Sequence, residues 1–138
     1  PSLRVDTIDD DISKLLNAMR QTGLTIAPEA GSQRLRNIIN KNITEEDILK
    51  SVYVSLTNGW RLIKLYFMIG LPFEEESDID AIIGLIKKII GISSKRLQIN
   101  VTISPFIPKS HTPFQWAALG EHDDLIRKAT KIKFAFSK

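Results

Sequence analysis

The sequence contains no cysteine and only two histidines, His111 and His122. A chain without thiols has no disulfide, no cysteine nucleophile and no thiolate ligand for a metal ion. Two imidazoles are also too few for an ordinary zinc site built from this chain alone. We therefore predict no metal ligands among its 138 residues.

Long apolar runs and a strong charge are missing as well. No apolar stretch approaches the roughly 20 residues that a membrane-spanning helix needs, and no signal-peptide pattern opens the chain. The 19 basic and 16 acidic residues leave a net charge of +3, which is too small for nucleic-acid binding without a clustered basic face. These absences predict a cytoplasmic globular protein with no membrane partner.

Helical and extended patterns alternate along the chain. Strands are predicted at 24–27, 62–69 and 97–104, where proline or glycine ends each run. Helices are predicted over 9–19, from Ser32, from Thr44 with Asp47 as a capping box, and from Ser77 or Asp78. The connections are too long for hairpins, so we predict a parallel sheet of right-handed βαβ units, an α/β fold.

Each predicted strand is polar on one side only. In the last strand, Gln98, Asn100, Thr102 and Ser104 alternate with apolar residues. A parallel sheet covered by helices on both faces would be apolar throughout. We interpret the polar face as the lining of an enclosed cavity, as in a barrel with a functional lumen. The alternative is a half-exposed sheet in an α+β fold, with water on the polar side.

The predicted strand ends carry the candidate site residues, because the carboxyl ends of strands hold the active sites of α/β barrels. Glu29 is suited to accept hydrogen bonds from hydroxyl or ammonium groups, although an acid before a helix is more often a capping residue. Lys64 and Tyr66 are expected to point inward, and Glu29 or Glu74 would be the ordinary ion-pair partner of Lys64. The loop at 105–116 is either a lid or a plain connection, with His111 a minor candidate for a base.

Three segments resemble radical S-adenosylmethionine enzymes, in the branch that includes methylthiotransferases and cobalamin-associated members. Their sequences are GLTIAPEAGSQRLRNIINKNITEEDI, RLIKLYFMIGLPFEEESDID and VTISPFIPKSHTPFQW. They resemble the fourth, fifth and sixth strands of that family with their following loops, and PSLRVD fits the end of the third. The resemblance is greatest to an uncharacterised subfamily that is often fused to a cobalamin-binding-like domain.

This resemblance implies the C-terminal portion of a partial (β/α)6 barrel, over residues 1–116, that binds S-adenosylmethionine. By position, Glu29 matches a polar residue that contacts the ribose or amino acid moiety, and Lys41 falls where the family has an arginine for the cofactor carboxylate. Tyr66 replaces an acidic residue near the ribose, and Lys64 precedes it on the same strand face. Met68 and the Phe106–Ile107 stretch are expected beside the adenine.

The family's cysteine loop, which holds a [4Fe–4S] cluster, lies upstream of these segments, and this chain has no cysteine. We therefore expect a fragment of an oxidoreductase that generates a 5′-deoxyadenosyl radical for hydrogen abstraction from an unknown substrate. The fragment alone is predicted to hold no cluster and to be inactive. Its expected partners are the missing N-terminal part of its own barrel or a second copy joined through the open sheet edge.

Two other functions remain open. Residues 117–138 are expected to form a trailing amphipathic helix, whose basic side chains are either a solvated face or a nucleic-acid-binding surface; they are Arg127, Lys128, Lys131 and Lys133. The second alternative is an unrelated α/β-barrel enzyme in which Lys64 forms an imine or binds an anion.

Overall fold

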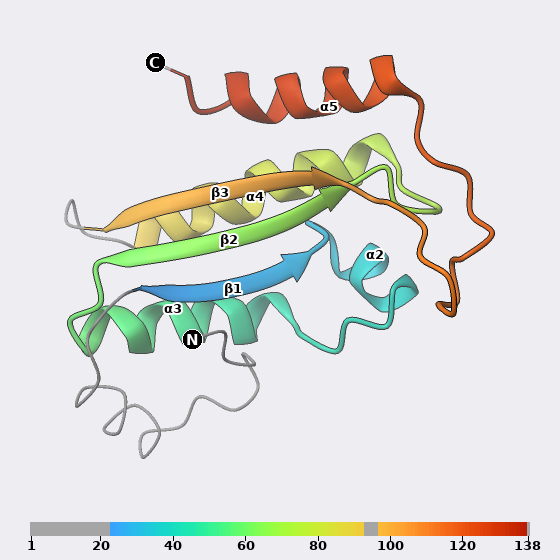
Figure 1. Cartoon of the computed structure of the whole chain (residues 1–138). Coiled ribbons are helices and arrows are strands. Elements are labelled where there is room, and N and C mark those ends of the chain that lie inside the picture. Colours follow the sequence, from blue (N-terminus) through green and yellow to red (C-terminus); the bar gives the residue numbers. More distant parts are fainter. Residues whose placement is uncertain (1–22, 93–96, 138) are drawn as a thin grey trace.

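The computed structural model describes residues 23–92 and 97–137 (Figure 1). The helix predicted over 9–19 and the strand end predicted at the start of the chain lie outside these residues. The described part of the chain is a parallel sheet with helices, which confirms the α/β class.

Three strands form the sheet in the order β1-β2-β3. They are β1 (Leu24–Glu29), β2 (Leu62–Ile69) and β3 (Gln98–Pro105). Both strand pairs are parallel, with Lys64 in register with Thr25 on one side and with Asn100 on the other. Because side chains alternate between faces along a strand, this register places Thr25, Lys64 and Asn100 on the same face. Glu29 lies beyond a shift in register and is opposite Phe67.

Four helices are described: α2 (Gln33–Ile38), α3 (Glu45–Thr57), α4 (Glu76–Ile92) and α5 (His122–Phe134). Ser32 caps α2 by accepting the Leu35 N–H at 3.0 Å. Thr44 and Asp47 form the predicted capping box at the start of α3. These caps satisfy backbone donors that the first turn of a helix leaves free.

The main core lies between one face of the sheet and the helices α3, α4 and α5 (Figure 1). Ile63, Leu65 and Phe67 of β2 are almost fully buried there, against the isoleucines of α4. Ile132 of α5 belongs to the same core, so the C-terminal helix is packed on the rest of the molecule. No helix in the described residues covers the opposite face.

The observed strands differ slightly from the predicted ones at their ends. β1 continues through Pro28 to Glu29 instead of stopping at Ala27, and β3 runs to Pro105. Both are edge strands within the described sheet. A proline is tolerated in an edge strand because its missing N–H faces away from the ladder.

Candidate functional site

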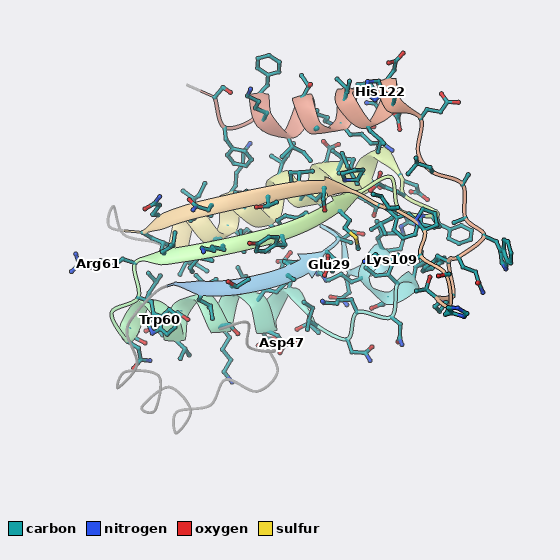
Figure 2. The ribbon with its side chains drawn as sticks, viewed as in Figure 1. Glu29, Asp47, Trp60, Arg61, Lys109 and His122 are labelled. Atoms are coloured by element: carbon teal, nitrogen blue, oxygen red, sulfur yellow. The ribbon has the colours of Figure 1, made fainter. Side chains whose placement is uncertain are left out.

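The carboxyl ends of the three strands meet at one edge of the sheet, as they must in a parallel arrangement (Figure 1). The loops that follow them therefore lie together, and the labelled Glu29 and Lys109 are at this end of the molecule (Figure 2). Trp60 and Arg61 are at the opposite end. The predicted site residues divide between this edge and the uncovered face of the sheet.

Glu29 and Lys41 form the polar part of the site. Lys41 Nζ lies 3.4 Å from Glu29 Oε1, and their side chains are 34% and 27% exposed. Glu29 adopts a φ of 66° at the end of β1, where the pairing with β2 shifts register. Such a conformation is uncommon for a residue with a side chain and is frequent at functional sites. The loop after α2 thus returns Lys41 to the strand end that carries Glu29.

An apolar cluster forms the second part of the site. Ala30, Leu35 and Leu71 are buried together, and Met68 and Phe106 are packed against them. Phe106 is held by its N–H, which donates to the Ile69 carbonyl at 2.8 Å. Its ring meets Phe114 edge to face, with centroids 6.3 Å apart. Of the residues predicted near an adenine, Met68 and Phe106 share this cluster, whereas Ile107 is exposed.

Lys64 and Tyr66 lie on the uncovered face of the sheet. Tyr66 is 39% exposed and is in register with Thr102. Lys64 is partly buried and has no ion pair with any described residue. The predicted ion pair of Lys64 with Glu29 or Glu74 was wrong, because Glu29 pairs with Lys41 and Glu74 pairs with Lys128 of α5. Sequence spacing does not indicate which of several acids a lysine meets.

Arg36 is a buried residue that the sequence reading missed. Its side chain is 1% exposed, and Nη1 donates to the carbonyls of Ala30 and Gly31 at 3.0 and 2.9 Å. Burial lowers the pKa of its guanidinium, an effect that Glu45 partly opposes. Arg36 therefore fixes the loop that follows Glu29. Its place beside Leu35 on a helix with a buried face was the available signal.

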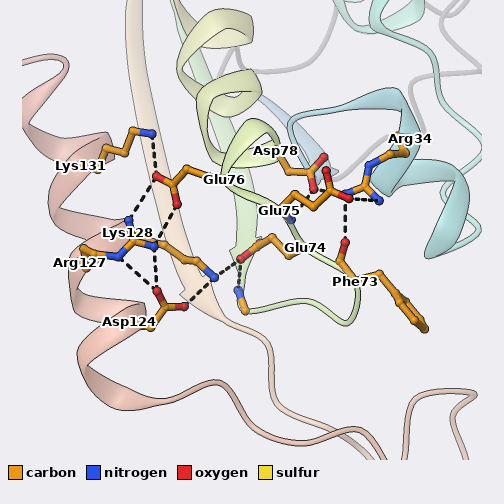
Figure 3. Close-up of polar contacts among 11 residues, drawn as sticks. Arg34, Phe73, Glu74, Glu75, Glu76, Asp78, Asp124, Arg127, Lys128 and Lys131 are labelled. Atoms are coloured by element: carbon orange, nitrogen blue, oxygen red, sulfur yellow. Dashed lines mark hydrogen bonds and ion pairs between the residues drawn. The ribbon is translucent and has the colours of Figure 1, made fainter.

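Asp78 is a second buried polar residue at this end of the sheet. From the sequence, it was named only as a possible helix start. It accepts hydrogen bonds from Arg34 Nη2 (Figure 3), from the Glu75 N–H and from Ser32 Oγ. It therefore links the start of α2 to the start of α4. Burial raises the pKa of Asp78, but these hydrogen bonds outweigh it and hold the pKa below its ordinary value.

Gly31 lies directly against the first turns of α4. A Cβ at Gly31 would come within 2.2 Å of the Ile82 nitrogen and 2.7 Å of the Asp78 carbonyl oxygen. Only glycine allows this approach, so Gly31 serves the packing of the two segments. The turn at Gly31 was predicted from the sequence, but its reason is the backbone of a helix far along the chain.

Three basic side chains of α5 are engaged in ion pairs (Figure 3). Arg127 and Lys131 both meet Glu76, at 2.9 and 2.7 Å. Their hydrogen bonds lower the pKa of Glu76 to about 2. Lys128 pairs with Glu74 and Asp124. Three of the four cations predicted as a basic face are thus neutralised by acids, which does not favour a nucleic-acid surface.

A separate apolar groove of about 470 Å³ lies between β3, α4 and α5. Its walls include Ile90, Val101 and Phe136, which are partly exposed. None of the carboxyl-end residues lines it. Its lining offers contact area but little polar chemistry.

Two kinds of feature were searched for over the described residues. No group of three or more histidine and acidic side chains there is placed to hold a metal ion. No helix among them is long and apolar enough to cross a membrane.

Comparison with known proteins gives a relative without an assigned activity. No family model matches the chain. The chain is 42% identical over 133 residues to the uncharacterized protein MJ0966 of Methanocaldococcus jannaschii. The match covers 96% of this chain but only 28% of that protein. The chain is therefore similar to part of a much longer protein whose name assigns no activity.

Proposed function

We propose that this chain is the C-terminal part of the partial (β/α)6 barrel of a radical S-adenosylmethionine enzyme. The longer protein would use the cofactor to generate a 5′-deoxyadenosyl radical that abstracts hydrogen from its substrate. The observation that carries the proposal is the meeting of Glu29 and Lys41 beside the Met68–Phe106 cluster at the carboxyl edge of a parallel sheet. The three segments that resemble the family supply that edge.

The residues at this edge suit S-adenosylmethionine chemically. The Glu29 carboxylate accepts hydrogen bonds from hydroxyl or ammonium groups, and the Lys41 ammonium attracts a carboxylate. Met68 and Phe106 offer a flexible thioether and an aromatic ring for a flat heterocycle. When bound, the cofactor supplies the radical chemistry, and these residues orient it and keep water from one side.

The iron–sulfur cluster is a different matter, because this chain fits it poorly. A [4Fe–4S] cluster is held by cysteine thiolates, and the sequence has none. The ligands would have to come from another part of the longer protein, as would the remaining barrel strands. The length of the relative, of which this chain matches 28%, leaves room for both.

The uncovered polar face is where the proposed barrel would have its lumen. Thr102 and Ser104 of β3 are exposed, as expected if missing strands would complete a lumen over them. The same missing strands, or a second copy of the chain, would pair with an outer strand of the sheet, β1 or β3.

The test uses the longer gene product that carries this chain, reconstituted anaerobically with iron and sulfide. After reduction we expect 5′-deoxyadenosine from S-adenosylmethionine, measured by chromatography. Glu29→Gln and Lys41→Met should each lower its rate, whereas Lys50→Met, at an exposed position of α3, should not. A gene product without a three-cysteine loop upstream of Pro1 would overturn the proposal. A [4Fe–4S] spectrum from this chain alone would overturn the separate prediction that the chain by itself holds no cluster.

A second candidate function rests on Lys64. This lysine is partly buried and lacks an acid partner among the described residues, which are conditions that favour an amine able to form an imine or to bind an anion. Borohydride trapping with a carbonyl compound, compared between the native chain and Lys64→Met, distinguishes this function from the first.

A further inference from the structure

The turn that follows β2 is closed by a buried carboxylate. The Gly70 N–H donates to Glu74 Oε2 at 2.8 Å, and the Glu74 side chain is only 2% exposed. Its other oxygen, Oε1, is buried and has no hydrogen-bond partner among the described residues. A carboxylate in this position requires a compensating charge, because an ionised acid is costly to remove from water.

That charge comes from the C-terminal helix. Lys128 Nζ lies 2.9 Å from Glu74 Oε2, the oxygen that accepts the Gly70 N–H. The same Nζ lies 2.7 Å from Asp124 Oδ2 (Figure 3). The Lys128 side chain is 12% exposed, whereas Lys131 and its partner Glu76 are 33% and 47% exposed. The Lys128 pair is therefore shielded from water and salt, and the neighbouring Lys131 pair is not.

The same helix also contacts the turn sterically. Gly70 has a φ of 76°, and a Cβ there would come within 2.7 Å of Leu125 Cδ2. The first turns of α5 thus lie directly on the backbone of the turn, and Lys128 holds its acid one helical turn later. Contact and charge act together at one place.

The other side of the turn faces the candidate site. Leu71 follows Gly70 and is buried with Ala30 and Leu35, and Met68 and Phe106 are packed against this cluster. A displacement of the turn would therefore displace Leu71, against whose cluster Met68 and Phe106 are packed; we call these two side chains the apolar wall of the site. We infer that Lys128 is a positioning residue, which acts through Glu74 and the Gly70–Leu71 turn to hold Met68 and Phe106 in place. What this wall binds rests on the proposed function; the coupling itself does not.

The test follows Met68 and Gly70 by NMR in the chain labelled with ¹⁵N and with ¹³C at the methionine methyl groups, of which there are only two. Lys128→Met should shift the Met68 methyl signal and the Gly70 amide signal by more than their line widths. Lys131→Met is the matched control on the same helix, and Lys128→Arg keeps the charge; both should leave these signals in place. A residue that only stabilised the fold would lower the melting temperature without moving Met68 in the folded state.

The double variant E74Q/K128M covers the case in which Lys128→Met does not fold. It leaves no unpaired charge and keeps an oxygen acceptor for the Gly70 N–H, but it loses the tie to α5. We expect it to fold with its Met68 signal still displaced from the native one. An unchanged Met68 signal in Lys128→Met, or in this double variant, overturns the inference. Because no cofactor is added, this result is independent of whether S-adenosylmethionine binds.

Discussion

The two faces of the sheet in this chain are opposites in chemistry and in cover. On one face, Ile63, Leu65 and Phe67 are sealed by helices. On the other, Lys64, Tyr66 and Thr102 meet no helix in the described residues, and Tyr66 and Thr102 are exposed. The same strands thus carry a complete core on one side and an unfinished surface on the other.

This difference shows which face of the sheet provides the folding stability of the chain. The covered face buries apolar area, which is the main source of folding free energy. The open face contributes little to folding, so its polar residues are free to serve another purpose. The carboxyl edge joins the two, because Glu29 and Lys41 lie there beside a small apolar cluster.

The largest expected effect comes from the covered face. Leu65→Ala removes a fully buried side chain in the centre of β2, and should lower the free energy of unfolding by about 2–5 kcal/mol. Lys64→Ala, one residue away on the open face, is the matched control. Urea unfolding followed by circular dichroism measures both. Equal losses would show that the two faces are not energetically different.

A smaller loss is expected where the covered face reaches the carboxyl edge. Gly31→Ala forces a Cβ against the backbone of α4 and should destabilise the chain by about 3 kcal/mol, as overpacking against rigid groups does. Gly84→Ala is the control within α4, since a Cβ there meets nothing within 4 Å. It should stabilise the helix by up to about 1 kcal/mol. Thermal unfolding of both variants checks the contrast.

Local patterns in the sequence predicted much of the covered face. The bounds of β2, the Ser32 cap and the capping box of α3 all depend on residues close together in the chain. The parallel direction of the strands was predicted from the long connections between alternating strands and helices. These features are set by propensity, capping and apolar period, which a sequence shows directly.

What the sequence did not show depends on contacts between distant residues. The partner of Glu74 is Lys128, far along the chain, so the expected pairing with Lys64 was wrong. Arg36 and Asp78 looked like ordinary helix residues and are buried polar anchors of the edge. Whether the polar face is enclosed also depends on what covers it, and the described residues do not include a cover.

The contribution of Asp78 to the free energy of unfolding should depend on pH. The pKa of this carboxyl is below its ordinary value in the folded chain, so its contribution to stability is present above about pH 4, near the pKa of an unfolded aspartate. It is lost as the pH falls through the folded pKa, because the unfolded state then binds the proton more readily. Asp78→Asn should cost about 2 kcal/mol at pH 7 and should flatten the acid limb of a pH series of urea unfolding curves. Asp123→Asn, at an exposed position of α5, should leave that limb unchanged.

The smallest energetic effect, and the sharpest test of the comparison, belongs to the open face. Thr102→Cys places the only thiol of the chain on that face, and should change the free energy of unfolding by less than about 0.5 kcal/mol. A bulky maleimide should label it rapidly in this chain, as it should Lys87→Cys on the exposed side of α4. In the longer protein of the proposed function, a lumen would protect position 102 while position 87 stays reactive. Peptide mass mapping measures the labelling at each site. Equal labelling of both positions in the longer protein would mean that the polar face is an ordinary wet surface, because a side chain inside a closed barrel is shielded from a bulky reagent whatever its chemistry.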